Sequence, residues 1–357
     1  MVMDNDRALR EACADLTLEL GWDGVTFSGV AKRAGLTVGA VYGRADSTAD
    51  LGADVWEADA GPWLCSVVEE LLAQGRTSDP ASVAAGFAVW EANPRMSAVV
   101  TELLIASLFD VDLAEVVLAD AREILGRRCT PSATVTAHQA AASTLFLSFA
   151  FGRALAARGG GTLPSIDFNQ LRALAGYFGA EPRVDMPAQP PRLEWRRDLD
   201  VLDPHFASLL SGTLDVIGRV GYKRATISKI ARTSKVPRGS VLNHFDSKVA
   251  LVAEAAHRCL VTPMGVWLQY EPVVGKHGAL VSRALFLRDF LAADNAANWA
   301  VNLELARTAQ FEPALAEFQV SGNVLEHTHL GVMLVAAVVP GLEGLPFIGP
   351  FMAGTAT

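Results

Sequence analysis

The chain has 357 residues, of which 51% are hydrophobic and 19% are charged. This length and composition predict two or more domains with sizeable cores and exclude an intrinsically disordered chain. The net charge of −9 argues against a protein that is basic throughout. Four widely spaced cysteines exclude a disulfide scaffold and a cysteine zinc finger, and they predict a reducing compartment.

The sequence predicts no membrane span. The N-terminal residues are polar and acidic, without the basic and then apolar pattern of a signal peptide. The uncharged stretch between Arg128 and Arg153 is strongly apolar only from Ala140 to Phe151, which is too short to cross a bilayer. We therefore expect buried helices, no membrane partner and a cytoplasmic protein.

The first predicted helices belong to an internal repeat, because residues 14–51 align without a gap with residues 214–251. Ten of the 38 aligned positions are identical, where chance gives roughly two to four in a chain so rich in Ala and Val. The identical pairs are Asp15/Asp215, Gly21/Gly221, Thr26/Thr226, Ser28/Ser228, Ala31/Ala231, Gly39/Gly239, Val41/Val241, Asp46/Asp246, Ser47/Ser247 and Leu51/Leu251. A duplicated architecture is the simplest interpretation.

Each copy predicts four short helices in the same order. Apolar residues at helical spacing, such as Leu9 and Leu16 or Leu209 and Val216, indicate a first helix that ends at the following glycine. The predicted N-caps of the second helices are Thr26 and Thr226, and those of the fourth helices are the Asp-Ser pairs at 46–47 and 246–247. Breaks at 35–37 and 235–237 precede a third short helix, and Pro237 is expected in its first turn.

Two short helices joined by a tight turn are typical of a helix-turn-helix unit, whose second helix enters the major groove of DNA. The local charge supports this interpretation for one copy only. Residues 1–60 hold 5 Lys/Arg and 11 Asp/Glu, a net charge of −6, whereas residues 201–260 hold 9 and 4, a net charge of +5. The second copy is therefore a basic stretch in an acidic protein.

The residues of both copies resemble the N-terminal signature of the TetR family of bacterial transcriptional regulators. In the first copy the resemblance rests on Gly21-Trp22, Thr26, Val30-Ala31, Gly39-Ala40-Val41-Tyr42, Asp46-Ser47 and Leu51. In the second it rests on Gly221-Tyr222, Thr226, Ile230-Ala231, Gly239-Ser240-Val241, His244-Phe245, Asp246-Ser247-Lys248 and Leu251. The first copy departs from the signature with Arg44-Ala45 in place of His-Phe and Thr48 in place of Lys.

The resemblance implies an all-α protein of two tandem TetR-like units, each a three-helix DNA-binding domain followed by a helical effector and dimerisation domain. We expect the two DNA-binding domains at 1–58 and 201–260, and the helical domains at 59–180 and 261–357, the latter truncated at its C-terminus. A linker is expected at 181–200, because residues 181–191 carry four prolines. The apolar stretches 133–151 and 324–339 are expected to pack against each other, as an interface between subunits does in that family.

Candidate DNA contacts lie on or beside the second and third helices of each copy and at the start of the fourth helix of the second copy. Arg238 and Asn243 have the hydrogen-bonding groups that recognise guanine and adenine, and the resemblance assigns Lys248 to a phosphate. The alternative for these residues is a solvated helix face. The candidates are Thr26, Ser28, Thr37, Val38, Ala40, Tyr42 and Arg44 in the first copy and Thr226, Ser228, Lys229, Arg238, Ser240, Asn243, His244 and Lys248 in the second.

Aromatic residues between and after the two copies are candidates for an effector pocket, with ordinary core packing as the alternative. The candidates are Trp63, Phe87, Trp90, His138, Trp267, Phe286 and Trp299. The His327-Thr328-His329 segment predicts no metal site, because residues two apart on a helix face different ways. We expect no cofactor and no catalytic site, since no nucleophile motif is present.

We therefore expect a transcriptional regulator that binds double-stranded operator DNA, a repressor modulated by a small hydrophobic effector. The chain is expected to act as a monomeric pseudodimer or as a homodimer of such chains. The first alternative is a ligand-sensing or partner-binding helical protein that has lost operator binding. The second is a helical enzyme that uses His138 or the His327/His329 pair.

Overall fold

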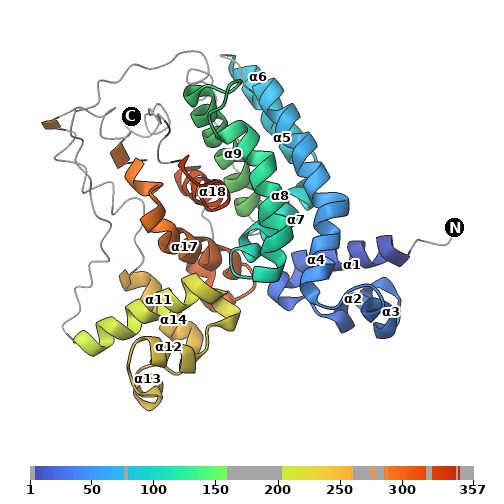
Figure 1. The fold of residues 1–357 in the computed structure, drawn as a ribbon. Helices are drawn as coiled ribbons and strands as arrows, with labels where there is room; N and C mark the ends of the chain where they lie inside the picture. The colour runs from blue at the N-terminus through green and yellow to red at the C-terminus, as the bar shows by residue number, and fades with distance from the viewer. Residues whose placement is uncertain are drawn as a thin grey trace.

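The computed structural model describes residues 5–75, 79–158, 203–259, 275–276, 285–286, 288–318, 324–342 and 345. Every regular element in these ranges is a helix, so the expected all-α class is confirmed for the described part of the chain (Figure 1). The expected linker at 181–200 and the candidate Trp267 lie outside these residues.

The N-terminal helices form a group that we call the first helix set. It consists of α1 (Asn5–Leu20), α2 (Phe27–Ala34), α3 (Val38–Tyr42) and α4 (Thr48–Val55). Helix α1 packs against both α2 and α4, and α2 packs against α3.

The second helix set has the same order of elements. It consists of α11 (Pro204–Arg224), α12 (Ile227–Thr233), α13 (Arg238–His244) and α14 (Lys248–Cys259). Gly221 kinks α11 with a φ of 73°, and Gly21 has a φ of 72° directly after α1. Because this conformation favours glycine, the first helix of each copy is interrupted at the glycine that the sequence predicted.

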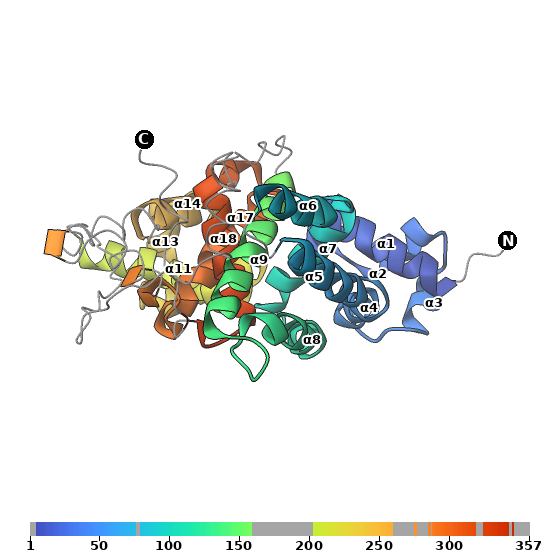
Figure 2. The same cartoon turned by 90° about the horizontal axis from the view of Figure 1, so that it is seen from above.

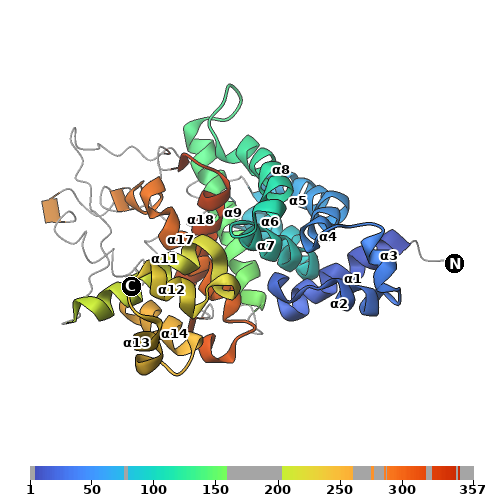
Figure 3. The same ribbon diagram turned by 60° about the horizontal axis from the view of Figure 1, so that its bottom comes forward.

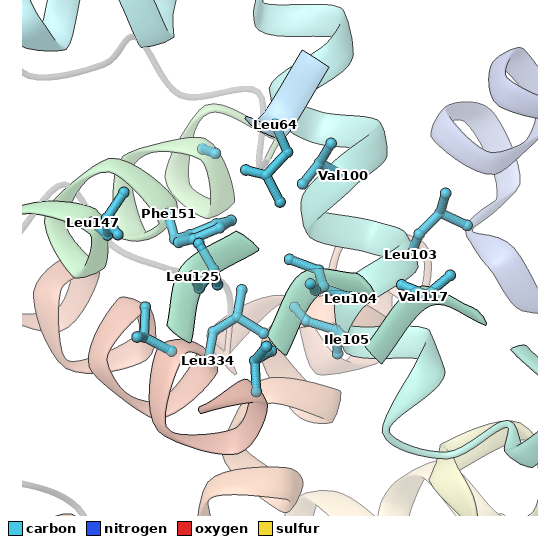
Figure 4. Close-up of a cluster of buried hydrophobic side chains, with 14 of the residues drawn as sticks. Leu64, Val100, Leu103, Leu104, Ile105, Val117, Leu125, Leu147, Phe151 and Leu334 are labelled. Carbon is cyan, nitrogen blue, oxygen red and sulfur yellow. The ribbon is translucent and has the colours of Figure 1, made fainter. Parts of the chain in front are cut away.

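Five longer helices follow the first set: α5 (Gly61–Gly75), α6 (Pro80–Glu91), α7 (Pro94–Ser107), α8 (Val111–Cys129) and α9 (Ala137–Arg158). A π-helical turn, Trp56–Ala60, joins α4 to α5. Asp79, Asn93 and Asp110 begin α6, α7 and α8, because each side chain accepts a hydrogen bond from a backbone N–H of the first turn. The core that these helices enclose is drawn in Figure 4, where Leu104 and Phe151 lie among its buried side chains.

The second half contributes α17 (Ala296–Thr308) and α18 (Val324–Val338), with 3₁₀ turns at Ala293–Asn295 and Pro313–Phe318. Helix α17 packs on α11 as α7 packs on α1, and α7 and α17 also contact each other. The two helix sets are therefore connected through these two central helices.

Helices α9 and α18 lie side by side over much of their length (Figure 2). Their backbones approach closely, because a Cβ placed on Gly331 would lie 1.7 Å from the carbonyl oxygen of Ser148. The packing of 133–151 against 324–339 that the sequence predicted is confirmed for the described residues. A single hydrophobic core runs across this contact and includes Phe151 and Leu334.

Helix α9 also contains the one described segment, Ala137–Ala157, that is long and apolar enough to cross a membrane by length and composition. Of its most apolar window, 94% is buried inside the protein. These side chains contact the protein's own core, and the segment is a core helix.

Thiol labelling checks this packing. Cys13, Cys129 and Cys259 are buried, whereas Cys65 is half-buried and lines a groove between α5 and α8. Burial raises the pKa of Cys13 and of Cys129 to about 12. Because the thiolate is the reactive form, we expect a maleimide to modify one cysteine in the native protein and four in denaturant, as counted by intact mass. Cys65→Ala should remove the native modification, and rapid modification of Cys13 or Cys129 would contradict the packing.

Candidate nucleic-acid interface

Helices α2 and α12 begin at matching caps and are followed by matching turns. The Thr26 hydroxyl accepts a hydrogen bond from the backbone N–H of Gly29 at 3.1 Å, and the Thr226 hydroxyl accepts one from Lys229 at 3.2 Å. Each turn then contains a left-handed residue, Gly35 with a φ of 68° or Lys235 with a φ of 57°. The predicted N-caps and tight turns are therefore present in both copies.

Helix α13 presents an open face. Val241 is fully buried in the hydrophobic core of the second helix set and anchors α13 there. Arg238, Asn243 and His244 are exposed, and Ser240 is half-buried. Pro237, expected in the first turn, instead precedes the first helical residue, where its fixed φ leads the chain into the helix. Figure 1 shows α3 and α13 on the same side of the molecule, one in each half, and Figure 3 brings that side forward.

Helix α3 presents a more apolar face. Val38 and Tyr42 are exposed, Ala40 is half-buried, and the Tyr42 ring lies against Phe27 with centroids 4.7 Å apart. The Thr37 hydroxyl caps α3 by accepting a hydrogen bond from the backbone N–H of Ala40 at 3.2 Å. Around this helix, Thr26 and Ser28 are exposed on α2 and its cap, as Thr226 and Ser228 are in the second set.

The arginines of the first helix set are paired with carboxylates of the same set or its flanking turn. Arg44, a candidate DNA contact, pairs with Asp6 and also donates to the Ala40 carbonyl. The other pairs are Arg7–Glu11, Arg10–Asp59 and Arg33–Glu19. This pairing leaves little free positive charge beside α3.

The cations of the second helix set have a different environment. Eight Lys/Arg lie from residue 219 to residue 248. Among the described residues none of these eight forms an ion pair with a carboxylate, whereas Arg258 and Arg307 of the second half do. Arg224 and Lys229 donate instead to backbone carbonyls, of Val220 and Arg224 respectively. Their charges therefore remain available to a polyanion near α13.

Lys248 occupies a more enclosed position than the other cations. Its ammonium group donates to the Tyr222 carbonyl at 2.9 Å and lies 3.9 Å from the centroid of the Tyr222 ring. Burial lowers the pKa of Lys248. Because an ammonium group has three hydrogens, this contact leaves donors for a phosphate, and the predicted phosphate contact stays a prediction.

The candidate effector residues of the first half gather in an aromatic cluster. The rings of Trp63 and Trp90 have centroids 5.3 Å apart, and Phe87 stacks on Phe146 at 4.2 Å. His138 lies at the beginning of α9 and is half-buried. Phe87 and Trp90 thus lie in the core, and the half-buried Trp63 packs against it. Their contact with an effector remains a prediction.

The candidates of the second half form a separate group. The Trp299 indole donates to the Phe290 carbonyl at 2.9 Å, and Phe286 stacks on Phe290 with centroids 5.7 Å apart. His329 lies against both phenylalanines, and burial lowers its pKa to about 4, so it is neutral at pH 7. No group of three or more His, Cys, Asp or Glu suited to a metal occurs among the described residues.

Two buried glutamates that the sequence analysis missed connect the helix sets to the central helices. Glu102 on α7 accepts the backbone N–H of Trp22 at 2.7 Å, and Glu304 on α17 accepts that of Tyr222 at 2.6 Å. The repeat contains a signal for them. It continues as TELLIASLFD at 101–110 and LELARTAQFE at 303–312, shifted by two residues, with glutamate second in each.

Near these glutamates, a phenylalanine of each half contacts the glycine that follows or kinks the first helix of the other half. A Cβ on Gly21 would lie 2.8 Å from the Phe311 ring, and a Cβ on Gly221 would lie 3.3 Å from Phe109. The phenylalanine of each half therefore packs on the glycine of the other half. Reciprocal contacts of this kind are typical of an interface with two-fold symmetry.

The second helix set has the arrangement of a helix-turn-helix domain, a class of DNA-binding unit. Residues 209–255 match the family model for bacterial regulatory proteins of the tetR family. The chain is also similar to proteins described as uncharacterized HTH-type transcriptional regulators, one from Mycobacterium bovis and two from strains of Mycobacterium tuberculosis. Each is 28% identical over 141 residues, which is 39% of this chain and 70% of the relative. These comparisons support a relationship to the TetR family.

Proposed function

We propose that the chain is a cytoplasmic transcriptional regulator that binds double-stranded operator DNA, with α13 in the major groove. The observation that carries this proposal is the exposed face of α13 among cations without carboxylate partners, within the segment that matches the family model. Arg238 and Asn243 then contact bases, and Ser228, Lys229 and Lys248 contact phosphates.

We further propose that the first helix set is a second DNA reader of weaker affinity. Its α3 offers Val38 and Ala40 for apolar contact, for example with a thymine methyl group. The support is the matching order of helices and caps in the two sets. In this proposal one chain carries both DNA readers, and the packing of α9 on α18 takes the place of an interface between two subunits.

The regulatory part of the proposal is a small hydrophobic effector that changes DNA affinity, with repression as the mode. Its support is the aromatic clusters beside the central helices, around Trp90 in the first half and Trp299 in the second. A coupling of about 1–3 kcal/mol between effector and DNA is typical of such proteins.

Selection of DNA sequences from a random pool by the full chain tests this function. We expect a site with one well-defined half and one loose half, because the two recognition helices differ at nearly every exposed position. The two halves should be centred roughly ten base pairs apart, one helical turn. Mass measurement of the complex should give one chain per site.

The control is a parallel selection with Asn243→Ala, which should lose the base preference at one position of the defined half. A perfect palindrome bound by two chains would contradict the single-chain arrangement. A pool without enrichment would overturn operator binding and favour a partner-binding protein.

A further inference from the structure

A single arginine connects both halves of the protein at its centre. Arg307 on α17 is buried, and its guanidinium donates to Glu304 at 2.7 Å and to Glu102 at 2.9 Å. It also donates to Asp23, in the turn after α1, at 2.6 Å. The three acceptors belong to α17, to α7 and to the first helix set.

The same glutamates hold the two helix sets. Glu102 accepts the Trp22 N–H of the first set and Glu304 accepts the Tyr222 N–H of the second. A continuous line of hydrogen bonds therefore runs from the first set through Glu102, Arg307 and Glu304 to the second set. We call these three side chains the central triad.

The triad departs from the two-fold pattern of the repeat. At the shift of two residues that pairs the glutamates, the counterpart of Arg307 is Ile105. Asp23 lies before this shift, in the ungapped part of the repeat, where its counterpart is Lys223. One guanidinium therefore serves both glutamates, and its bond to Asp23 has no equivalent in the second set. Two identical subunits related by symmetry would supply two arginines or none, so this triad requires two halves that differ at this position.

Because the triad is buried, any displacement that breaks its hydrogen bonds is costly. Both glutamates are fully buried, and Arg307 is buried with them. Burial lowers the pKa of Arg307, but Glu304 and Glu102 together raise it well above its ordinary value, so it stays charged. A displacement of the halves that breaks these bonds while the groups stay enclosed would leave buried charges without partners, which is strongly unfavourable.

A cavity of about 290 Å³ lies beside the triad and is open to both helix sets. Asp23 of the first set and Tyr222 and Lys248 of the second set are in its wall, together with Arg307. The helix sets are separated by this space on one side. The bonds of the triad are thus polar links that cross between the halves where packing is incomplete.

We propose that Arg307 is a positioning residue that fixes the two helix sets relative to each other. The consequence for DNA rests on the function proposed above: the triad sets the half-site spacing that one chain can span. Variants that break the line of bonds should widen the distribution of distances between the sets and relax the preference for one spacing.

Distance measurement between nitroxide labels on Lys32→Cys and Arg232→Cys tests the proposal without DNA. Both positions are exposed, one on α2 and one on α12, and the background carries Cys65→Ala. In the triple variant Glu102→Gln, Glu304→Gln and Arg307→Met, each amide oxygen still accepts its backbone N–H while the bridge is lost. We expect the distribution to widen at least about two-fold.

Asp23→Ala is the second variant, because Asp23 is partly exposed and its loss leaves the three buried side chains of the central triad bonded to one another. It should widen the distribution less than the triple variant does. Lys223→Ala, at the matching position of the second set, should change nothing. The proposal is overturned if the triple variant keeps its helical circular dichroism and its distance distribution is unchanged. If the triple variant does not fold, an unchanged distance distribution in Asp23→Ala overturns the proposal instead.

The DNA consequence has its own measurement. The parent protein should prefer the best spacing over one longer by two base pairs by about tenfold, and the triple variant should reduce this ratio toward one. If the parent binds no DNA, the proposed function fails while the distance measurement still decides the role of Arg307. If DNA binds with an unaltered ratio in a widened triple variant, the spacing consequence is wrong.

Discussion

Gly331→Ala is expected to lower the free energy of unfolding by about 3 kcal/mol or more. The added methyl group would lie 1.7 Å from the Ser148 carbonyl oxygen and 2.9 Å from the Gly152 nitrogen. Both atoms belong to the backbone of α9, so no side-chain rotation relieves the clash. Helix α18 must move away from α9, and the core that spans the two halves loses contacts along the whole interface.

Urea unfolding followed by circular dichroism measures this loss. Gly126→Ala is the matched control, because a Cβ at Gly126 in α8 meets only the Thr130 hydroxyl at 3.9 Å. That variant should be neutral or gain about 0.5–1 kcal/mol from the better helix propensity of alanine. Equal stabilities of the two variants would show that α9 and α18 do not pack as closely as described.

Arg238→Ala is expected to weaken DNA binding by about 1–3 kcal/mol, because it removes a base contact. Lys248→Ala should weaken binding on every sequence and reduce the slope of log affinity against log salt by about 0.9, because it removes a phosphate contact. Arg44→Ala should have a smaller effect, because its guanidinium is already paired with Asp6. Fluorescence anisotropy over a series of salt concentrations provides both quantities.

Lys32→Ala is the matched control for the first set, since Lys32 is exposed on α2 and forms no ion pair among the described residues. A greater loss for Lys32→Ala or Arg44→Ala than for Arg238→Ala and Lys248→Ala would mean that the first helix set supplies most of the affinity. The assignment of the stronger reader to the second set would then be wrong.

Much of the local structure was predictable from the sequence. Thr26 and Thr226 cap helices, Gly21 and Gly221 interrupt them, and the helical class of the chain follows from its apolar spacing. These features depend on residues within about one turn of each other, and the hydrogen bonds that satisfy a helix end are made locally. The repeat itself was visible because both copies keep the same local signals.

The environment of each charge was decided only by the tertiary structure. Arg44 meets Asp6 from 38 positions away, and Arg307 meets Glu102 from 205 positions away. Nothing in the sequence beside Arg44 distinguishes it from Arg238, which is also exposed and forms no ion pair among the described residues. Ion pairs join groups that lie close in space, so their partners are set by how helices pack rather than by the order of residues.

The sequence by itself determined the order of the short helices in each copy, the threonines and glycines at which the first two of them begin or end, and that the pattern occurs twice. Only the tertiary structure decided that α9 packs on α18 through Gly331, that Phe109 and Phe311 cross to the opposite halves, and that one arginine joins two buried glutamates. The physical reason is the range of the forces involved. Helix signals act over a few residues, whereas burial and close packing select partners from the whole chain, and the cost of an unpaired buried charge makes that selection strict.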